Sequence, residues 1–138
     1  MVTLVISCFA NGLAMTTFNT KILDHFYHPR GAGKLDERDQ SVQTSRITTP
    51  DGTTVMQLQL QLEGELIKQA CFQTLGCPAC IAVTSVICEY LQQHPYWRAL
   101  KDLTSDYLIE ILQLPPATHY CAWLGKDLIQ KLRSQSFE

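Results

Sequence analysis

The chain has 138 residues, 46% of them hydrophobic and 17% charged, which is the size and composition of one compact domain. Its net charge of −2 offers no extended basic surface, and the aromatic residues are not interleaved with Lys and Arg, which argues against nucleic acid as a partner. No segment approaches the ~20 apolar residues of a membrane span, so no membrane association is expected. Six cysteines point to metal, sulfur or redox chemistry, or to a core that uses small apolar side chains.

Residues 1–14 precede the segment that we interpret as the domain. This stretch is mostly apolar and ends in GLA at 12–14, a pattern that signal peptidases accept, but no Lys or Arg precedes it. A secretory signal is therefore the lesser interpretation. We expect either an extension from a mis-assigned start or a strand or helix packed on the body. The domain itself is expected to occupy residues 15–138.

The first element expected in the domain is a short amphipathic helix. Apolar residues recur at three- and four-residue spacing from Ile22 to Tyr27 and stop before Pro29. The segment 33–52 is polar and lacks periodicity, so it is predicted to be a long loop. Loops of this length are often functional.

A β-hairpin is predicted next. Residues 55–62 alternate strictly between apolar and polar, which predicts a strand with one buried face and one wet face made of Gln57, Gln59 and Gln61. A turn follows, and residues 66–73 supply the returning strand. We expect a third strand to join this hairpin in a small antiparallel sheet.

The second half of the chain is predicted to be helical. One helix covers residues 78–92, where Pro78 suits the first helical position. Thr104 or Ser105 caps a second helix, which must end before Pro115. A sheet followed by packed helices describes an α+β fold. A third helix is expected from apolar residues at helical spacing, namely Cys121, Leu124, Leu128, Ile129 and Leu132.

Three motifs in this chain resemble those of a known family. DHFYHPRG at 24–31 is similar to the DHxxNPRN opening of NifU/IscU-type iron-sulfur cluster assembly scaffolds. FQTLGC and the following IA, within 72–82, resemble FxTxGCxxxIA, and LPP at 114–116 before Cys121 resembles LPPxxxHC. The motifs occur in the same order at nearly the same intervals over residues 15–135. The resemblance implies an IscU-like fold and a carrier of iron or a transient iron-sulfur cluster that is not an enzyme.

The resemblance also implies a set of ligands. The family has a Cys and, two residues later, an Asp in the loop before the strand, a second Cys at the helix start, and a His-Cys pair at the last helix. The corresponding residues here are Gly52, Thr54, Cys77, Tyr120 and Cys121. Two thiolates, Cys77 and Cys121, therefore remain as candidate metal ligands, and their sulfurs are expected to face one pocket.

Three further residues are candidate replacements for the missing ligands. Asp51 precedes a glycine, which favours a turn over a ligand role, and for His119 a loop facing solvent is likewise the favoured interpretation. Cys80 lies one turn after Cys77, on the same helix face, but it also suits a buried core position. Of the remaining cysteines, Cys8 has no interpretation, and packing roles are predicted for Cys71 and Cys88.

The sequence from Cys77 to Cys80 also supports a different function. Two cysteines separated by two residues at a helix N-terminus are typical of a dithiol redox or persulfide site, because the helix end stabilises a thiolate. A thioredoxin-like motif should follow a strand of a βαβ unit, whereas a hairpin precedes this one. Zinc is another alternative, although a single pair supplies only half of a tetrahedral site.

A third hypothesis makes the protein a cluster-free interaction module. Leu114, Pro115 and Pro116 begin a segment similar to LPPVK, by which an Hsp70-type chaperone recognises some family members, although Thr118 replaces the Lys. The prolines equally suit a simple break between helices. Our principal expectation is a cytoplasmic carrier that receives sulfur from a cysteine desulfurase.

Overall fold

The structure is a computed structural model that describes residues 5–7, 18–64 and 66–136. Cys8, the 12–14 pattern and the start of the predicted domain at residue 15 lie outside the described residues. In chain order the elements are β1 (Val5–Ser7), α2 (Thr20–Tyr27), β2 (Val42–Thr48), β3 (Val55–Glu63), β4 (Leu66–Gly76), α3 (Pro78–Gln93), α4 (Tyr96–Asp102), α5 (Ser105–Leu112), the 3-10 turn η2 (Pro116–Thr118) and α6 (His119–Ser136).

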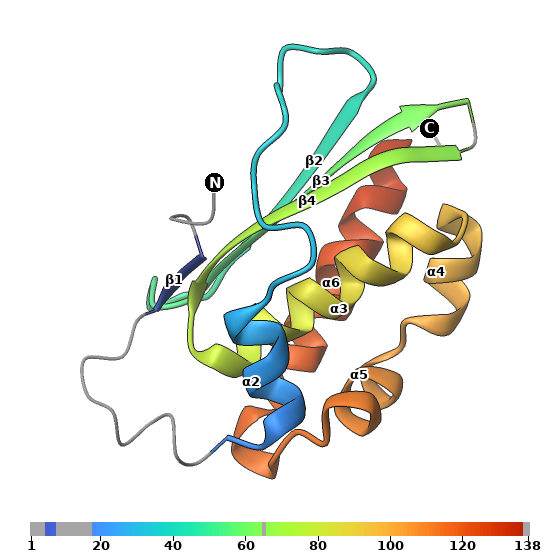
Figure 1. Cartoon of the computed structure of the whole chain (residues 1–138). Coiled ribbons are helices and arrows are strands. Elements are labelled where there is room, and N and C mark those ends of the chain that lie inside the picture. Colours follow the sequence, from blue (N-terminus) through green and yellow to red (C-terminus); the bar gives the residue numbers. More distant parts are fainter. Residues whose placement is uncertain (1–4, 8–17, 65, 137–138) are drawn as a thin grey trace.

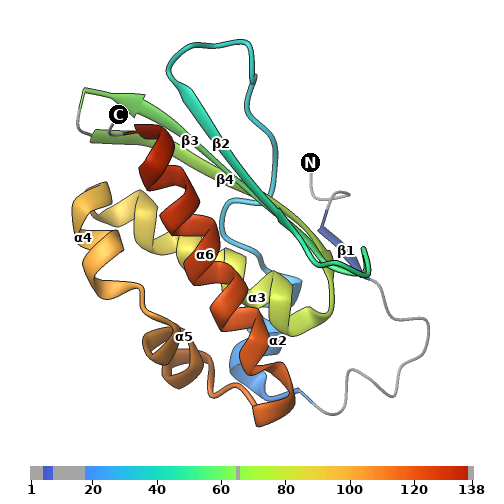
Figure 2. The ribbon, with the colours of Figure 1, turned by 180° about the vertical axis from the view of Figure 1, so that it is seen from behind.

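The strands form one sheet in the order β1-β4-β3-β2 (Figure 1). Strands β2, β3 and β4 are antiparallel neighbours, whereas β1 pairs in parallel with the end of β4. The helices lie together on one side of the sheet, as the view from behind also shows (Figure 2). The predicted α+β fold with a hairpin and a third antiparallel strand is confirmed, and β1 adds a short strand from within residues 1–14.

Residues 33–52 are not one long loop, because β2 lies within them. It pairs with β3 along its whole length. The β2 sequence, VQTSRIT, is mostly polar, so apolar alternation does not reveal it. The hydroxyl of the buried Ser45 donates a 2.9 Å hydrogen bond to the carbonyl of Leu128 in α6, which allows a polar side chain at the interface between sheet and helix.

Two of the three glutamines on β3 are buried, contrary to the predicted wet face, whereas Gln61 is partly exposed. Gln57 and Gln59 are 2% and 1% exposed. The side-chain oxygen of Gln59 accepts a hydrogen bond from the backbone N–H of Leu35 at 2.7 Å, and its amide donates to the hydroxyl of Thr44 at 3.2 Å. The oxygen of Gln57 accepts from the guanidinium of Arg46 at 3.1 Å. The segment that carries Leu35 crosses this face (Figure 1), so these glutamines are buried with partners.

Helix α4 was not expected from the sequence. It has seven residues, Pro95 is its N-cap, and only Tyr96 and Ala99 are buried, which is too few to produce a helical pattern. The hydroxyl of Tyr96 donates a 2.8 Å hydrogen bond to the carbonyl of Ile129 in α6. A single long-range contact of this kind therefore helps to hold α4 on the body.

The other predicted helices, now α2, α3, α5 and α6, are confirmed. Helix α3 begins at Pro78, which has no N–H to leave unpaired. Thr104 caps α5 by accepting a 3.1 Å hydrogen bond from the backbone N–H of Tyr107. Among the described residues, no helix is both long enough and apolar enough to cross a membrane.

Candidate metal centre

Three cysteines from two helices meet at one end of the helical layer. Cys77 is the N-cap of α3, with extended backbone angles of φ −80° and ψ 167°, and Cys80 lies in the first turn of the same helix. Cys121 lies in the first turn of α6. Within the described part of the chain, these three form the one group of His, Cys, Asp or Glu side chains whose ligand atoms all lie within 4.8 Å of one another. We call this group the thiol cluster.

The distances within the thiol cluster are close to those of a metal site. The Sγ atom of Cys77 lies 3.6 Å from that of Cys80 and 3.9 Å from that of Cys121. The Sγ atoms of Cys80 and Cys121 are 2.9 Å apart. Tetrahedral thiolate ligands at a metal–sulfur distance of about 2.3 Å place their sulfurs about 3.8 Å apart. Two distances fit this value closely, and the third requires Cys80 and Cys121 to separate by roughly 0.9 Å.

A close contact between α3 and α6 places Cys121 near Cys80. A Cβ atom on Gly125 would lie 2.6 Å from Cγ1 of Val83 and 3.0 Å from Cδ1 of Ile87, so a side chain there would push the helices apart. Cys121 lies one turn before Gly125, on the same face of α6. The glycine therefore lets the first turns of both helices approach.

The end of β4 packs against the thiol cluster through Gly76. A Cβ atom on Gly76 would lie 3.3 Å from Cβ of Cys80 and 3.3 Å from Cγ2 of Thr54, tighter than most contacts of this kind. Thr54 is 5% exposed. The position that resembles the family's Asp therefore lies beside the thiol cluster, but it carries a hydroxyl and a methyl group.

Cys77 carries the negative charge of the thiol cluster. Hydrogen bonds with the thiols of Cys121 and Cys80 lower its pKa from 9.0 to about 2, against the opposing effect of burial. The backbone N–H of Cys80 and the hydroxyl of Tyr120 act in the same direction. The N-terminus of α3 also favours negative charge at this position. Cys77 is therefore a thiolate at neutral pH.

The other two cysteines of the cluster remain thiols. The hydrogen bond with Cys121 acts to lower the pKa of Cys80, but the hydrogen bond with Cys77, burial and the charge of Cys77 together raise it to about 12. Hydrogen bonds with Cys77 and Cys80, with burial, raise the pKa of Cys121 further still. The cluster thus holds one negative charge and two protons. A bound metal ion would displace the two protons.

Tyr120 contacts the thiol cluster, a role that our sequence reasoning did not assign to it. Its hydroxyl lies 3.8 Å from Sγ of Cys77 and 4.0 Å from Sγ of Cys80. Burial, followed by the nearby charges of Cys80, Cys121 and Cys77, raises its pKa, so the side chain is a neutral phenol. Two signals in the sequence pointed to it, namely its position next to Cys121 and its correspondence to the His of the family pattern.

Neither of the other two candidate ligands joins the thiol cluster. The Asp51 carboxylate accepts hydrogen bonds from the backbone N–H of Thr53 at 3.1 Å and from the hydroxyl of Thr49 at 2.8 Å, and these bonds lower its pKa. Asp51 therefore belongs to a turn. Nε2 of His119 forms a 3.0 Å hydrogen bond with the carbonyl of Leu114. Both side chains are held by neighbouring residues instead.

The segment 114–118, which resembles LPPVK, ends in a compact turn. Leu114 is 5% exposed, and residues 116–118 of the segment form the 3-10 turn η2. The hydroxyl of Thr118 donates a 2.8 Å hydrogen bond to the carbonyl of Pro115. Of the three residues predicted to bind a partner, Pro116 alone is fully at the surface.

The remaining described cysteines lie outside the thiol cluster. Cys88 is fully buried in the core, and Cys71 is half-buried in β4. Burial raises the pKa of both thiols. Their positions agree with the packing roles that we expected.

The α+β fold and the thiol cluster define a domain that can bind a metal through cysteine. The family described as the NifU-like N terminal domain matches residues 17–134. This match covers most of the sequence, so the chain belongs to that family. The family resemblance identified from its three motifs is confirmed.

Curated relatives match over a similar span. The iron-sulfur cluster assembly scaffold protein IscU of Haemophilus influenzae is 33% identical over 114 residues, which are 82% of this chain and 90% of the relative. IscU of Azotobacter vinelandii is 33% identical over 114 residues, or 82% and 88% of the two chains. Iron sulfur cluster assembly protein 1 of Trachipleistophora hominis is 33% identical over 113 residues, or 82% and 81%.

Solved structures share the fold at lower sequence identity. A protein assigned as an iron-sulfur cluster assembly scaffold of the SUF system, from Fervidobacterium islandicum, aligns with a TM-score of 0.65 at 16% identity. The alignment covers 84% of this chain and 96% of that one. A NifU-like protein from Brucella abortus gives a TM-score of 0.60 at 14% identity, covering 86% and 95%.

Proposed function

We propose that this protein is a carrier in iron-sulfur cluster assembly and holds iron or a labile cluster on Cys77, Cys80 and Cys121. The observation that carries this proposal is the convergence of three sulfurs in a NifU-like domain. Thiolate sulfur is the usual ligand of iron in clusters. The named function of the IscU relatives, cluster assembly on a scaffold, supports the same conclusion.

Cys80 supplies a third thiolate in this proposal. The family pattern has other ligands at the positions of Gly52, Thr54 and Tyr120, and none of these residues offers a thiolate, carboxylate or imidazole. Three thiolates leave a fourth position at a tetrahedral metal. An open position of this kind lets cargo enter and leave, which a carrier requires and a closed structural site prevents.

Loading of the thiol cluster depends on pH in this account. Cys80 and Cys121 hold protons because their pKa values are raised. A divalent metal must displace these protons, so its affinity should rise as the pH rises. Zinc also accepts three thiolates and one further ligand, and it is therefore a competitor for the same site.

Cys77 is the residue that we propose to receive sulfur. It is partly exposed, whereas Cys80 and Cys121 are 0% exposed. The Cys77 thiolate would attack the outer sulfur of a persulfide on a cysteine desulfurase. The sulfur–sulfur bond of the donor breaks, the donor cysteine leaves as a thiolate, and a persulfide forms on Cys77.

The remaining parts of the proposal concern cell biology. We assign no turnover to the protein itself, because a carrier needs ligands and access but no general acid or base. We place it in the cytoplasm, where the reducing environment keeps such thiols free. Recognition by an Hsp70-type chaperone would involve the surface near Pro116, and Leu114, which is buried in the core, would have to become exposed.

Anaerobic reconstitution with iron and sulfide tests the proposed function. The natural chain should retain both elements after desalting, and Cys71→Ser should retain as much because Cys71 lies outside the thiol cluster. A variant with all three cluster cysteines changed to serine should retain neither. If the natural chain retains no more metal than this variant while remaining folded, the carrier function fails and the cluster-free interaction module takes its place.

Dithiol exchange is the second candidate function, and the 3.6 Å distance between the sulfurs of Cys77 and Cys80 supports it. Mild oxidation followed by mass mapping separates the two functions. A redox couple requires a Cys77–Cys80 disulfide, and Cys80→Ser should then accumulate mixed disulfides on Cys77. If oxidation leaves Cys77 and Cys80 unlinked, the dithiol function is removed.

A further inference from the structure

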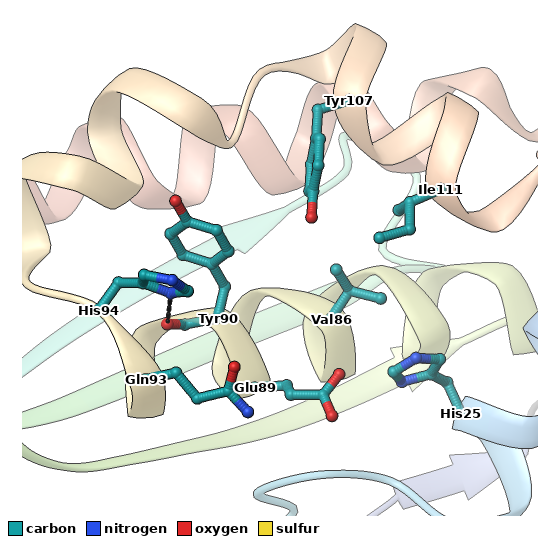
Figure 3. A pocket seen from close by; sticks show the side chains of 8 residues that line it. All are labelled: His25, Val86, Glu89, Tyr90, Gln93, His94, Tyr107 and Ile111. Atoms are coloured by element: carbon teal, nitrogen blue, oxygen red, sulfur yellow. Dashed lines mark hydrogen bonds between the residues drawn. The ribbon is translucent and has the colours of Figure 1, made fainter.

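A separate cavity of about 300 Å³ lies between α3, α2 and α5 (Figure 3). Glu89, one of its lining residues, follows Cys80 by nine residues, which is about 14 Å along the axis of α3. The cavity therefore does not belong to the thiol cluster, and the inference drawn from it does not rest on the proposed function. Its lining residues are His25, Val86, Glu89, Tyr90, Gln93, His94, Tyr107 and Ile111.

The charge of this cavity is negative. Glu89 is its one carboxylate, and no Lys or Arg lines it. Nε of Arg30 lies 3.7 Å from the Glu89 carboxylate, but Nη2 of Arg30 lies 2.8 Å from the carboxylate of Asp24. One guanidinium thus serves two carboxylates, and a negative charge is left over. The Glu89 side chain is 41% exposed, so it is accessible to a cation.

The two histidines also present a hydrogen-bonding pattern to the cavity. The Tyr90 carbonyl can only accept, so Nδ1 of His94, 3.1 Å away, is the donor of this hydrogen bond. The hydroxyl of Ser85 accepts from the backbone N–H of Arg30 and lies 2.8 Å from Nδ1 of His25. Burial, and then the charge of Arg30, lowers the pKa of His25, so it adds no positive charge at neutral pH.

Aromatic rings form the wall opposite Glu89 (Figure 3). The rings of Tyr90 and Tyr107 meet edge to face, with centroids 6.3 Å apart, and His94 stacks on Tyr90 at 4.0 Å. The Tyr90 hydroxyl donates to the carboxylate of Asp102, which fixes its ring. Aromatic faces attract cations, and Val86 offers an apolar surface to an aliphatic stem. A long cationic side chain matches each of these features.

A second cavity, of about 230 Å³, adjoins the first and shares Gln93 and His94 with it. Leu66 at this second cavity is 65% exposed. Two adjoining hollows of different character suit successive side chains of one polypeptide better than a single small cation. The other residues that line the second cavity are mostly apolar, namely Leu66, Ile67, Leu91, Gln92 and Pro95.

We propose that these two cavities form a docking groove for a segment of a partner protein. The segment places an arginine or lysine side chain beside Glu89 and against the rings of Tyr90 and Tyr107. An adjacent apolar side chain of the same segment occupies the second cavity at Leu66. Charge complementarity selects the cationic residue, and the apolar hollow sets the position of its neighbour.

Nuclear magnetic resonance titration of the full chain tests this groove. The probe is acetyl-Leu-Arg-Leu-amide, and its matched control carries citrulline, the neutral isostere of arginine. The arginine peptide should shift the amide signals of Glu89, His94 and Tyr107 to saturation, and the citrulline peptide should bind at least about tenfold more weakly. Equal binding of the two peptides would overturn the proposal.

Variants assign the effect to the groove. Glu89→Gln and Tyr107→Leu should each weaken binding of the arginine peptide by several-fold, with both changes at partly exposed positions that folding tolerates. Glu110→Gln removes an exposed carboxylate of α5 outside the groove and should change nothing. Agmatine, a free guanidinium, should bind more weakly than the peptide. Tighter binding of agmatine would make the groove a small-cation site and overturn docking of a protein.

Discussion

The first turns of α3 and α6 carry candidate metal ligands, whereas the turn between β2 and β3 carries none that reaches them. The family resemblance places ligands in both regions. At the helix ends, the three sulfurs are fixed by packing, including the close contact at Gly125. In the turn, Gly52 has a φ of 75°, and a Cβ atom there would meet nothing within 4 Å. The Asp51 carboxylate accepts hydrogen bonds from the backbone N–H and the hydroxyl of Thr53, within the same turn.

The candidate site thus differs from the ligand pattern that the family resemblance implies. Helices α3 and α6 hold two thiols of the expected set and a third, Cys80, which lies beside them. The turn offers no ligand side chain at Gly52, and Thr54, just before β3, offers only a hydroxyl. All three candidate ligands therefore lie on the two helices, and four experiments follow from this difference.

Removal of a helix-end thiol should have the largest effect. Cys121→Ser leaves two thiolates, so its affinity for ferrous iron should fall at least about 100-fold, measured by competition with a chromogenic chelator. Asp51→Ala, in the turn, should leave the affinity unchanged because Asp51 does not reach the thiol cluster. A larger loss of affinity in Asp51→Ala than in Cys121→Ser would place the metal site in the turn and contradict this account.

Gly125→Ala should destabilise the packing of α6 against α3. Its Cβ atom would meet Val83 at 2.6 Å, and the overpacking should outweigh the better helix propensity of alanine, for a net loss of about 1–2 kcal/mol in the free energy of unfolding. Chemical denaturation measures this loss. Gln130→Ala, on the exposed face of α6, should change it by less than about 0.5 kcal/mol. Equal stability of both variants would show that close packing at Gly125 is unimportant.

Introducing the family's ligand residues at the three positions that lack them should increase cluster binding. The triple change Gly52→Cys, Thr54→Asp and Tyr120→His should raise cluster occupancy several-fold after identical reconstitution. The positive φ of Gly52 strains any side chain by roughly 1–2 kcal/mol, which Gly52→Ala measures separately. If the triple variant folds as well as the natural chain and binds no more iron and sulfide, the assignment of these three positions is wrong.

The charge of the thiol cluster should be visible in alkylation rates. Because the pKa of Cys77 is lowered to about 2, its thiolate persists from pH 8 to pH 6, and its rate with iodoacetamide should change little. Burial raises the pKa of Cys71 above 9.0, so its rate should fall about tenfold per pH unit. Site-resolved mass spectrometry compares the two. If the alkylation rates of Cys77 and Cys71 change with pH in parallel, Cys77 is not a thiolate in this pH range.

Much of the fold was predictable because its signals are local. Alternation in β3, Pro78 at the start of α3 and Thr104 before α5 each report a local preference. The burial of Gln59 was not predictable, because its partners Leu35 and Thr44 come from a segment without apolar periodicity. Helix α4 likewise depends on long-range contacts.

The candidate site was predictable in part for the same reason. The family resemblance identified Cys77 and Cys121, and the spacing of two residues identified Cys80 as a candidate. The contact of Tyr120 with the sulfurs was not predictable, since it depends on how α6 approaches α3 at Gly125. The sequence alone also could not reveal the bond between His119 and the carbonyl of Leu114, which holds that side chain outside the thiol cluster in this structure.

Anaerobic titration with cobalt(II) tests most directly whether the three thiols act as one metal site. Thiolate ligands give sulfur-to-cobalt charge-transfer absorption, which grows with the number of thiolates bound. The natural chain should bind one cobalt ion with this absorption, and Cys80→Ser should lose about one third of its intensity because one of three thiolates is gone. An unchanged spectrum and affinity in Cys80→Ser would contradict the account, since Cys80 would then be a core residue and not a ligand.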